Sequence, residues 1–154
     1  MEVLNGLLYI NEVDVFDEYS AFLTEDAAGK HDNYSELLAP PKTKPYIAVD
    51  FREDDGEKLP DVLPSPAFQA RDVVLYFAIL ADISDVFFEK YYAFIEFLKS
   101  GWLEFNVIEL KKTYKMYYLE CSKYDQLTEF VDDRQQAARF SVKFREPIPD
   151  FNSI

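Results

Sequence analysis

The sequence predicts an α+β fold, in which one main helix packs against an antiparallel β-sandwich or a partly closed barrel. Segments that alternate apolar and polar residues, as half-buried strands do, occur along most of the chain. One stretch repeats its apolar residues at the spacing of a helix, and it lies between two strand-like segments. A chain of 154 residues favours a single domain over 1–154 and buries roughly 68–70% of its unfolded surface.

The main helix is expected at about 85–99, between strands at 71–80 and 102–107. Ser84 is placed to cap its first turn, and Gly101 is placed to end it with a positive φ. The predicted inner stripe consists of Phe87, Tyr91, Phe94, Ile95 and Leu98.

Three further aromatic residues widen the apolar surface of this helix beyond the stripe, namely Phe88, Tyr92 and Phe97. The simplest interpretation is a broad helix face that packs on the sheet. A ligand-binding aromatic box is an alternative, and a neighbouring subunit would also bury the surplus.

The first quarter of the chain predicts short strands at 7–10 and 13–15. Residues 19–23 are a further apolar piece that favours a strand over the alternative of one helical turn. Loop chemistry follows over 24–38, so that a projecting loop or arm is expected at about 24–66. Within it, residues 46–51 alternate like a strand.

The last part of the expected arm, residues 59–66, contains three prolines among apolar residues. Proline excludes this segment from a helix or from the centre of a sheet. Such a segment lies extended along a partner or along the flank of its own domain. Leu59, Val62 and Leu63 are therefore candidate subunit contacts.

The second half of the chain predicts a hairpin and a final strand. The hairpin joins the strand at 102–107 to a long strand at 113–121 through a connection at 108–112. After a connector and a turn at 132–135, the final strand at 138–146 alternates cleanly. Its expected inward residues are Ala138, Phe140, Val142 and Phe144.

The formal net charge of −13 argues against binding along nucleic-acid phosphates, which requires lysine and arginine. An acidic wall would instead let a polyanion pass without adhering, although the charge also suits simple solubility. No secretory signal and no membrane span are expected.

No catalytic, cofactor or metal site is predicted, and the chain is not expected to be an enzyme. Cys121 has only His31 as a candidate base, and one histidine with flexible acids such as Asp26 and Asp32 is a weak metal pattern. Glu104 and Glu120 are candidates for a carboxylate pair across the hairpin. The single cysteine fits a reducing compartment such as the cytoplasm.

Several stretches share a layout with a known family. Residues 5–15 precede a Tyr-x-x-Phe-Leu piece at 19–23, and residues 70–77 contain an Arg-Asp-Val-x-Leu-x-Phe strand before the helix. Residues 101–103 after the helix and 140–147 at the end fit the same order. This layout resembles phage and prophage tail proteins of the distal tail type, and covers their ring-forming N-terminal part.

The resemblance implies a structural subunit that forms homo-oligomeric rings, often hexamers, between the tail tube and the baseplate. Its partners would be itself and neighbouring tail-tube or baseplate proteins, first in the cytoplasm and then in the virion tail. The acidic charge would then line a channel for DNA. The candidate subunit interface consists of Leu59, Val62, Leu63, Phe88, Tyr92 and Phe97.

A monomeric peptide- or carbohydrate-binding module is the alternative. It predicts a concave site with exposed aromatic side chains such as Tyr114, Tyr117 and Tyr118.

Overall fold

The computed structural model describes residues 4–25, 29–130 and 134–151. Within these residues, seven strands form one antiparallel sheet in the order β2-β1-β5-β6-β7-β4-β3, which stays open between β2 and β3. The predicted α+β class is confirmed. The elements are β1 (Leu8–Ile10), β2 (Val13–Asp14), α1 (Val15–Tyr19), β3 (Ala21–Leu23), α2 (Asp32–Leu38), β4 (Arg71–Ala81), α3 (Ser84–Leu98), β5 (Leu103–Val107), η1 (Ile108–Leu110), β6 (Lys112–Gln126) and β7 (Gln136–Glu146).

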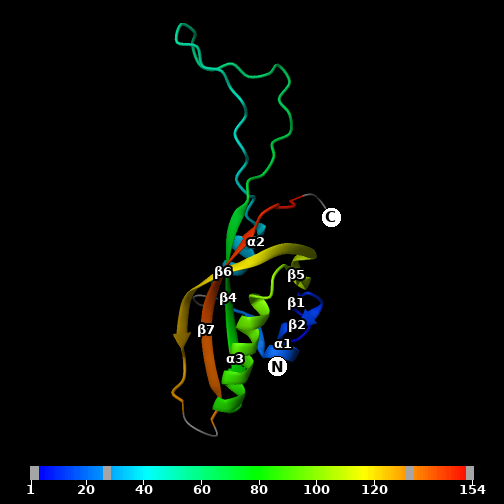
Figure 1. Ribbon diagram of the computed structural model, residues 1–154, viewed down its shortest axis with the longest axis vertical. Coiled ribbons are helices and arrows are strands. Elements are labelled where there is room, and N and C mark those ends of the chain that lie inside the picture. Colours follow the sequence, from blue (N-terminus) through cyan, green and yellow to red (C-terminus); the bar gives the residue numbers. More distant parts are fainter. Residues whose placement is uncertain (1–3, 26–28, 131–133, 152–154) are drawn as a thin grey trace.

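The long strand β6 turns this one sheet into a sandwich. Its first part pairs with β5 and its second part pairs with β7, so that β6 passes from one layer to the other (Figure 1). The register shifts between Tyr118 and Glu120 and again between Cys121 and Lys123. Such irregularities bend a strand. The two layers meet where the rings of Phe105 and Phe144 lie 4.8 Å apart.

Helix α3 packs on the inner face of β4 and β7, as the sequence predicts (Figure 1). The helix buries Phe87, Phe94 and Leu98 from the predicted stripe. Phe77 of β4 lies 5.4 Å from the ring of Phe94 and 5.8 Å from that of Phe140. All four predicted inward residues of β7 are buried as well.

The predicted start of α3 is wrong in its cap, whereas the predicted role of Gly101 after the helix is confirmed. Ser84 is the first helical residue and not the cap, which is Ile83. The Ser84 hydroxyl is buried, and it has no hydrogen-bond partner among the described residues. Gly101 has a φ of +133°, in the positive range that favours glycine, as expected after the helix end at Leu98.

Three expectations for the first half of the chain are wrong. The strand expected at 13–15 ends at Asp14, because Asp14 caps helix α1, which begins at Val15. The loop expected over 24–38 contains a helix at Asp32–Leu38, which is too short to show a periodic pattern. The strand expected at 46–51 forms only an isolated bridge from Val49 to Lys58. This segment lacks a neighbouring strand, because it lies on a projection away from the sheet (Figure 1).

Helix α2 forms because it completes the free edge of β4. Beyond the end of β3, the backbone N–H of Tyr76 donates to Asn33 Oδ1 at 2.7 Å, and Asn33 Nδ2 donates to the Tyr76 carbonyl at 3.2 Å. The N–H of Val74 donates to Glu36 at 3.3 Å. These side chains satisfy the edge groups that would otherwise pair with another strand.

The hairpin of β5 and β6 confirms the prediction, with Leu103, Phe105 and Val107 buried. Strand β6 is longer than the expected 113–121, because it extends through Gln126 alongside β7. Of the expected turn at 132–135, Asp132 and Asp133 lie outside the described residues.

Candidate functional site

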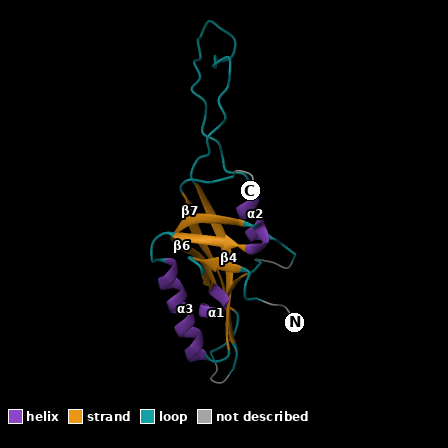
Figure 2. Cartoon of the chain, turned by 90° about the vertical axis from the view of Figure 1, so that its right-hand side faces the viewer, coloured by secondary structure: helices purple, strands orange, loops and turns teal. Residues whose placement is uncertain are grey.

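The main candidate is the projection between α2 and β4, residues 42–67, which we call the arm. It leaves one end of the sandwich and extends far beyond it (Figures 1 and 2). All of its residues are exposed. Residues 42–66 of the arm lie within the range 24–66 that the sequence indicates for a projection.

The arm has a first leg that runs out from residue 42 and a second leg that returns to residue 67. The two legs are joined at the base and near the tip. At the base, Lys44 N donates to Ala67 O at 2.7 Å and Gln69 N to Lys42 O at 2.7 Å. Near the tip, the N–H groups of Val49 and Lys58 donate to each other's carbonyls at 2.9 and 2.7 Å. Between these points no backbone hydrogen bond links the legs within the described chain.

The arm carries large apolar side chains that its own chain leaves exposed. Ile47 and Val62, on opposite legs, are 91% and 84% exposed. The remaining members are Tyr46, Val49, Phe51, Leu59 and Leu63. The predicted contact residues Leu59, Val62 and Leu63 therefore all lie on the arm. Ile47, Val49 and Phe51 were missed because their alternation indicated a strand of the sheet.

The arm is fixed to the body by Arg71, the first residue of β4. Its guanidinium donates to the carbonyls of Ala39 at 2.8 Å and Leu37 at 3.3 Å, next to the start of the arm. The same group donates to the buried carboxylate of Glu146 on β7 at 3.0 Å. Burial raises the pKa of Glu146 above its ordinary value, and the charge of Arg71 opposes this shift. Both ends of the arm therefore meet at one buried ion pair.

The predicted helix residues differ in exposure. Tyr92 is 64% exposed, while Phe88 and Phe97 are half-buried. The ring of Phe97 stacks on Tyr19 of α1 at 5.2 Å. Helix α1 therefore covers part of the surplus apolar surface within the same chain.

Phe88 and Tyr92 belong to a second apolar surface, formed by α3 and the segment around the end of β6. The ring of Phe88 lies 5.0 Å from Phe130 and 6.3 Å from Tyr92. Tyr91 connects this group to Tyr124 at 5.4 Å. We call Phe88, Tyr92, Tyr124 and Phe130 the aromatic patch. The sequence did not reveal Tyr124 and Phe130 as members, because only folding brings the end of β6 beside α3.

The structure does not assemble the reactive groups that the sequence left open. Burial raises the pKa of the Cys121 thiol, which disfavours the thiolate, and His31 pairs with Glu25 at 3.3 Å. Asp26 lies outside the described residues. Among the residues that are described, no three potential metal ligands cluster.

The prediction that Glu104 and Glu120 form a carboxylate pair across the hairpin is wrong. Glu104 lies opposite Lys115 in the register of β5 and β6. Glu120 forms an ion pair with Lys143 at 3.4 Å.

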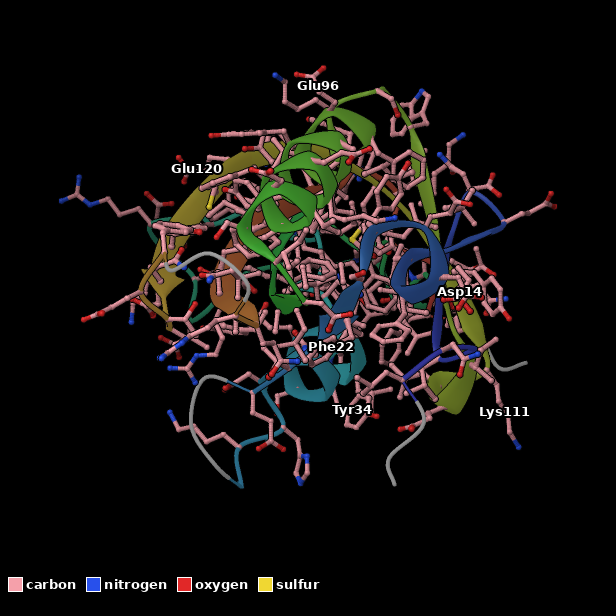
Figure 3. The ribbon with its side chains drawn as sticks, turned by 90° about the horizontal axis from the view of Figure 1, so that it is seen from below. Asp14, Phe22, Tyr34, Glu96, Lys111 and Glu120 are labelled. Carbon is pink, nitrogen blue, oxygen red and sulfur yellow. The ribbon has the colours of Figure 1, made fainter. Side chains whose placement is uncertain are left out.

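One cavity of about 740 Å³ opens between the two layers, where the sheet is not closed. Leu8, Phe22 and Val107 supply apolar walls, and Tyr34 and Arg139 supply polar groups. Tyr34 donates to Glu109, and this hydrogen bond and burial raise the pKa of Tyr34 to about 12. Figure 3 shows Phe22 and Tyr34 on the opposite side of the molecule from Glu96 of α3.

The tyrosines expected for a binding module do not form one exposed site. Tyr114 is buried, whereas Tyr117 contacts Trp102 at 5.6 Å and Tyr118 packs against the core. Within the described parts of the chain, no helix is both long and apolar enough to span a membrane.

No known family model matches the sequence, and the search of curated proteins found no match. The fold is similar to that of SPP1 Dit (gp 19.1), which is described as a paradigm of the hub adsorption apparatus in phages that infect Gram-positive bacteria. The TM-score is 0.53 at 11% sequence identity. The match covers 94% of this chain and 49% of that chain, so this chain spans about half the length of Dit. At this identity the likeness shows a shared fold.

Proposed function

We propose that this chain is a structural subunit of a phage or prophage-derived tail, and that it forms a homo-oligomeric ring at the junction of tube and baseplate. The observation that carries the proposal is the arm, a long exposed segment rich in apolar side chains. Monomeric proteins rarely expose large contiguous apolar surfaces, and such surfaces mark interaction sites. A subunit that is built into an assembly has a use for one.

The fold supports this role by likeness. The fold of a phage hub protein is similar to that of this chain over 94% of its length. The motifs at 5–23, 70–77 and 140–147 resemble the distal tail family independently of the structure. The partners we propose are further copies of this chain, with six as the ring size, and neighbouring tail-tube or baseplate proteins.

The charge of the chain fits a channel for DNA. A net charge of −13 on 154 residues gives a surface that repels phosphates. A ring with such a lining would let DNA pass without specific binding. In this proposal the protein assembles in the cytoplasm and remains in the virion tail.

Light scattering on a size-exclusion column, across a concentration series, tests the proposal. We expect a discrete ring-sized species, or a shift towards one as the concentration rises. Electron microscopy of that species should show a closed ring with a central channel. A discrete dimer without a channel would contradict the ring.

One observation favours the alternative of a monomeric module that binds a peptide or a carbohydrate. The cavity of about 740 Å³ falls within the size range of ligand sites and combines apolar walls with Tyr34 and Arg139. A monomer that binds glycans or peptides from an array, and loses that binding in Y34A, would favour this function over the ring.

A further inference from the structure

We propose that the arm of one copy docks on the aromatic patch of the next copy, with its proline-rich leg lying across the rings of α3. The inference rests on the proposed function, because it names the contact by which copies would join. It commits to a second copy of this chain as the occupant of both surfaces.

The first argument is the chemistry of the two surfaces. The second leg of the arm contains Pro60, Pro64 and Pro66, and Val62 lies exposed between them at a bend of the chain. Extended proline-rich segments dock on surfaces lined by aromatic rings, because their conformation is already ordered before binding. The aromatic patch presents such rings, with Tyr92, Tyr124 and Phe130 exposed by 64%, 40% and 52%.

The second argument is charge. The exposed ridge of α3 carries Asp85, Glu89 and Glu96 on either side of Tyr92 along the helix, and Glu96 also pairs with Lys99 at 3.5 Å. The first leg of the arm carries Lys42 and Lys44 and has no acidic residue before Asp50. Among the ion pairs of the described chain, none involves Lys42, Lys44 or Glu89. The lysines of the first leg thus match the acidic ridge, whereas the proline-rich leg carries one acidic residue, Asp61.

The third argument is size. The arm contributes 26 consecutive exposed residues. A stable protein interface uses roughly 20–30 residues on each side. The arm is therefore long enough to supply one side of such an interface.

The placement of the two surfaces gives the contact a direction. The arm leaves one end of the molecule, whereas α3 lies along the body and begins at the opposite end (Figures 1 and 2). Two different surfaces at separate ends make a head-to-tail contact, in which each copy gives an arm and receives one. Such contacts form rings when the rotation between copies closes.

The test mixes two variants that each lack one surface. The arm variant carries Ile47→Asp and Val62→Asp, and the patch variant carries Tyr92→Glu. All three side chains are exposed, so the fold is expected to survive, and thermal unfolding of each variant checks this. Ile148→Asp, at an aliphatic side chain that is 86% exposed outside both surfaces, is the matched control.

We expect each variant alone to associate at least about tenfold more weakly than the wild type. The control should assemble like the wild type. An equimolar mixture should form 1:1 dimers, because the intact arm of the patch variant meets the intact patch of the arm variant. A symmetric arm-to-arm contact would not be restored by mixing. Reversing Lys42 and Lys44 to glutamate should weaken assembly, and Glu89→Lys with Glu96→Lys should restore it.

The inference is overturned if either folded variant assembles like the wild type, if the mixture stays monomeric, or if the wild type itself is monomeric at the highest attainable concentration. If both variants still form rings, the proposed function is supported, and surfaces other than the arm and the aromatic patch join the copies. Absence of rings in the wild type, with 1:1 dimers still forming in the mixture, would support the contact and count against the ring.

Discussion

The body and the arm both contain segments with a strand-like pattern, but the segment in the body is buried and the segment in the arm is exposed. Strand β7 alternates apolar and polar side chains, and residues 46–51 place Ile47, Val49 and Phe51 on one face of an expected strand. Strand β7 pairs with β4 on one side and β6 on the other, and buries Phe140, Val142 and Phe144. In the arm, Ile47 is 91% exposed and Phe51 is 48% exposed.

The difference shows that a strand-like pattern indicates an apolar face that is stabilised by burial. The pattern does not identify which surface buries it. The inward side chains of β7 find α3 and the opposite layer within the chain. Those of the arm contact the other leg: the Tyr46 hydroxyl donates to the Pro64 carbonyl at 3.1 Å, and Lys58 lies over the Phe51 ring at 5.5 Å. Stability should therefore reside in the body and association in the arm.

The largest effect on folding is expected at Phe77. Phe77→Ala should lower the free energy of unfolding by about 3–5 kcal/mol, because the ring is fully buried among Phe94, Phe140 and Phe144. Urea unfolding measures the change. Val62→Ala in the arm is the control, and a loss at Val62 as large as that at Phe77 would erase the contrast between body and arm.

Next in size is the buried ion pair at the base of the arm. Arg71→Ala should cost about 3 kcal/mol, because it leaves the Glu146 carboxylate buried without its partner. Arg145→Ala is the matched control, since its pair with Asp72 is half-exposed and contributes about 0.2–1 kcal/mol. Equal losses in thermal unfolding would show that the buried pair is not special.

Asn33 tests the edge of the body. Asn33→Ala should lower the free energy of unfolding by about 1–3 kcal/mol, because Tyr76 loses two hydrogen bonds at a buried position. Ser35→Ala on the exposed side of α2 is the control. Hydrogen exchange of the Tyr76 amide should accelerate only in the Asn33 variant, and unchanged exchange would remove the proposed role of α2.

A smaller effect is the pH dependence that Glu146 adds. The folded state raises the pKa of this carboxyl above the ordinary 4.5, so it favours the protonated form. The stabilisation is complete below that value and is lost as the pH rises through the higher pKa of the folded state. As the pH rises above about 4.5, the wild type should therefore lose stability relative to E146Q. A difference independent of pH contradicts the shift.

The smallest effect on folding is expected for the arm itself. Replacing residues 45–66 by a short Gly-Ser linker should change the free energy of unfolding by less than about 0.5 kcal/mol, because these residues are exposed. Thermal unfolding of the shortened chain, in comparison with wild type, measures the change. A loss of several kcal/mol would mean that the arm belongs to the folding unit.

Much of the fold could be predicted because its pattern is local. The stripe of α3 and the alternation of β7 and β5 specify an element and its buried face within a few residues. The same holds for part of the candidate site, since prolines around Leu59, Val62 and Leu63 keep that segment out of the sheet. Helix α2 could not be predicted, because it depends on the free edge of β4, which is distant in the sequence.

By itself, the sequence determined the α+β class, the inner face of the main helix and the exclusion of residues 59–66 from the sheet. Only the tertiary structure decided that β6 bends from one layer to the other, that residues 46–51 stay outside the sheet, and that Tyr124 and Phe130 join Tyr92 in one patch. Local patterns choose an element and its apolar side. Which surfaces then meet depends on contacts between distant residues, and those are fixed only when the chain folds.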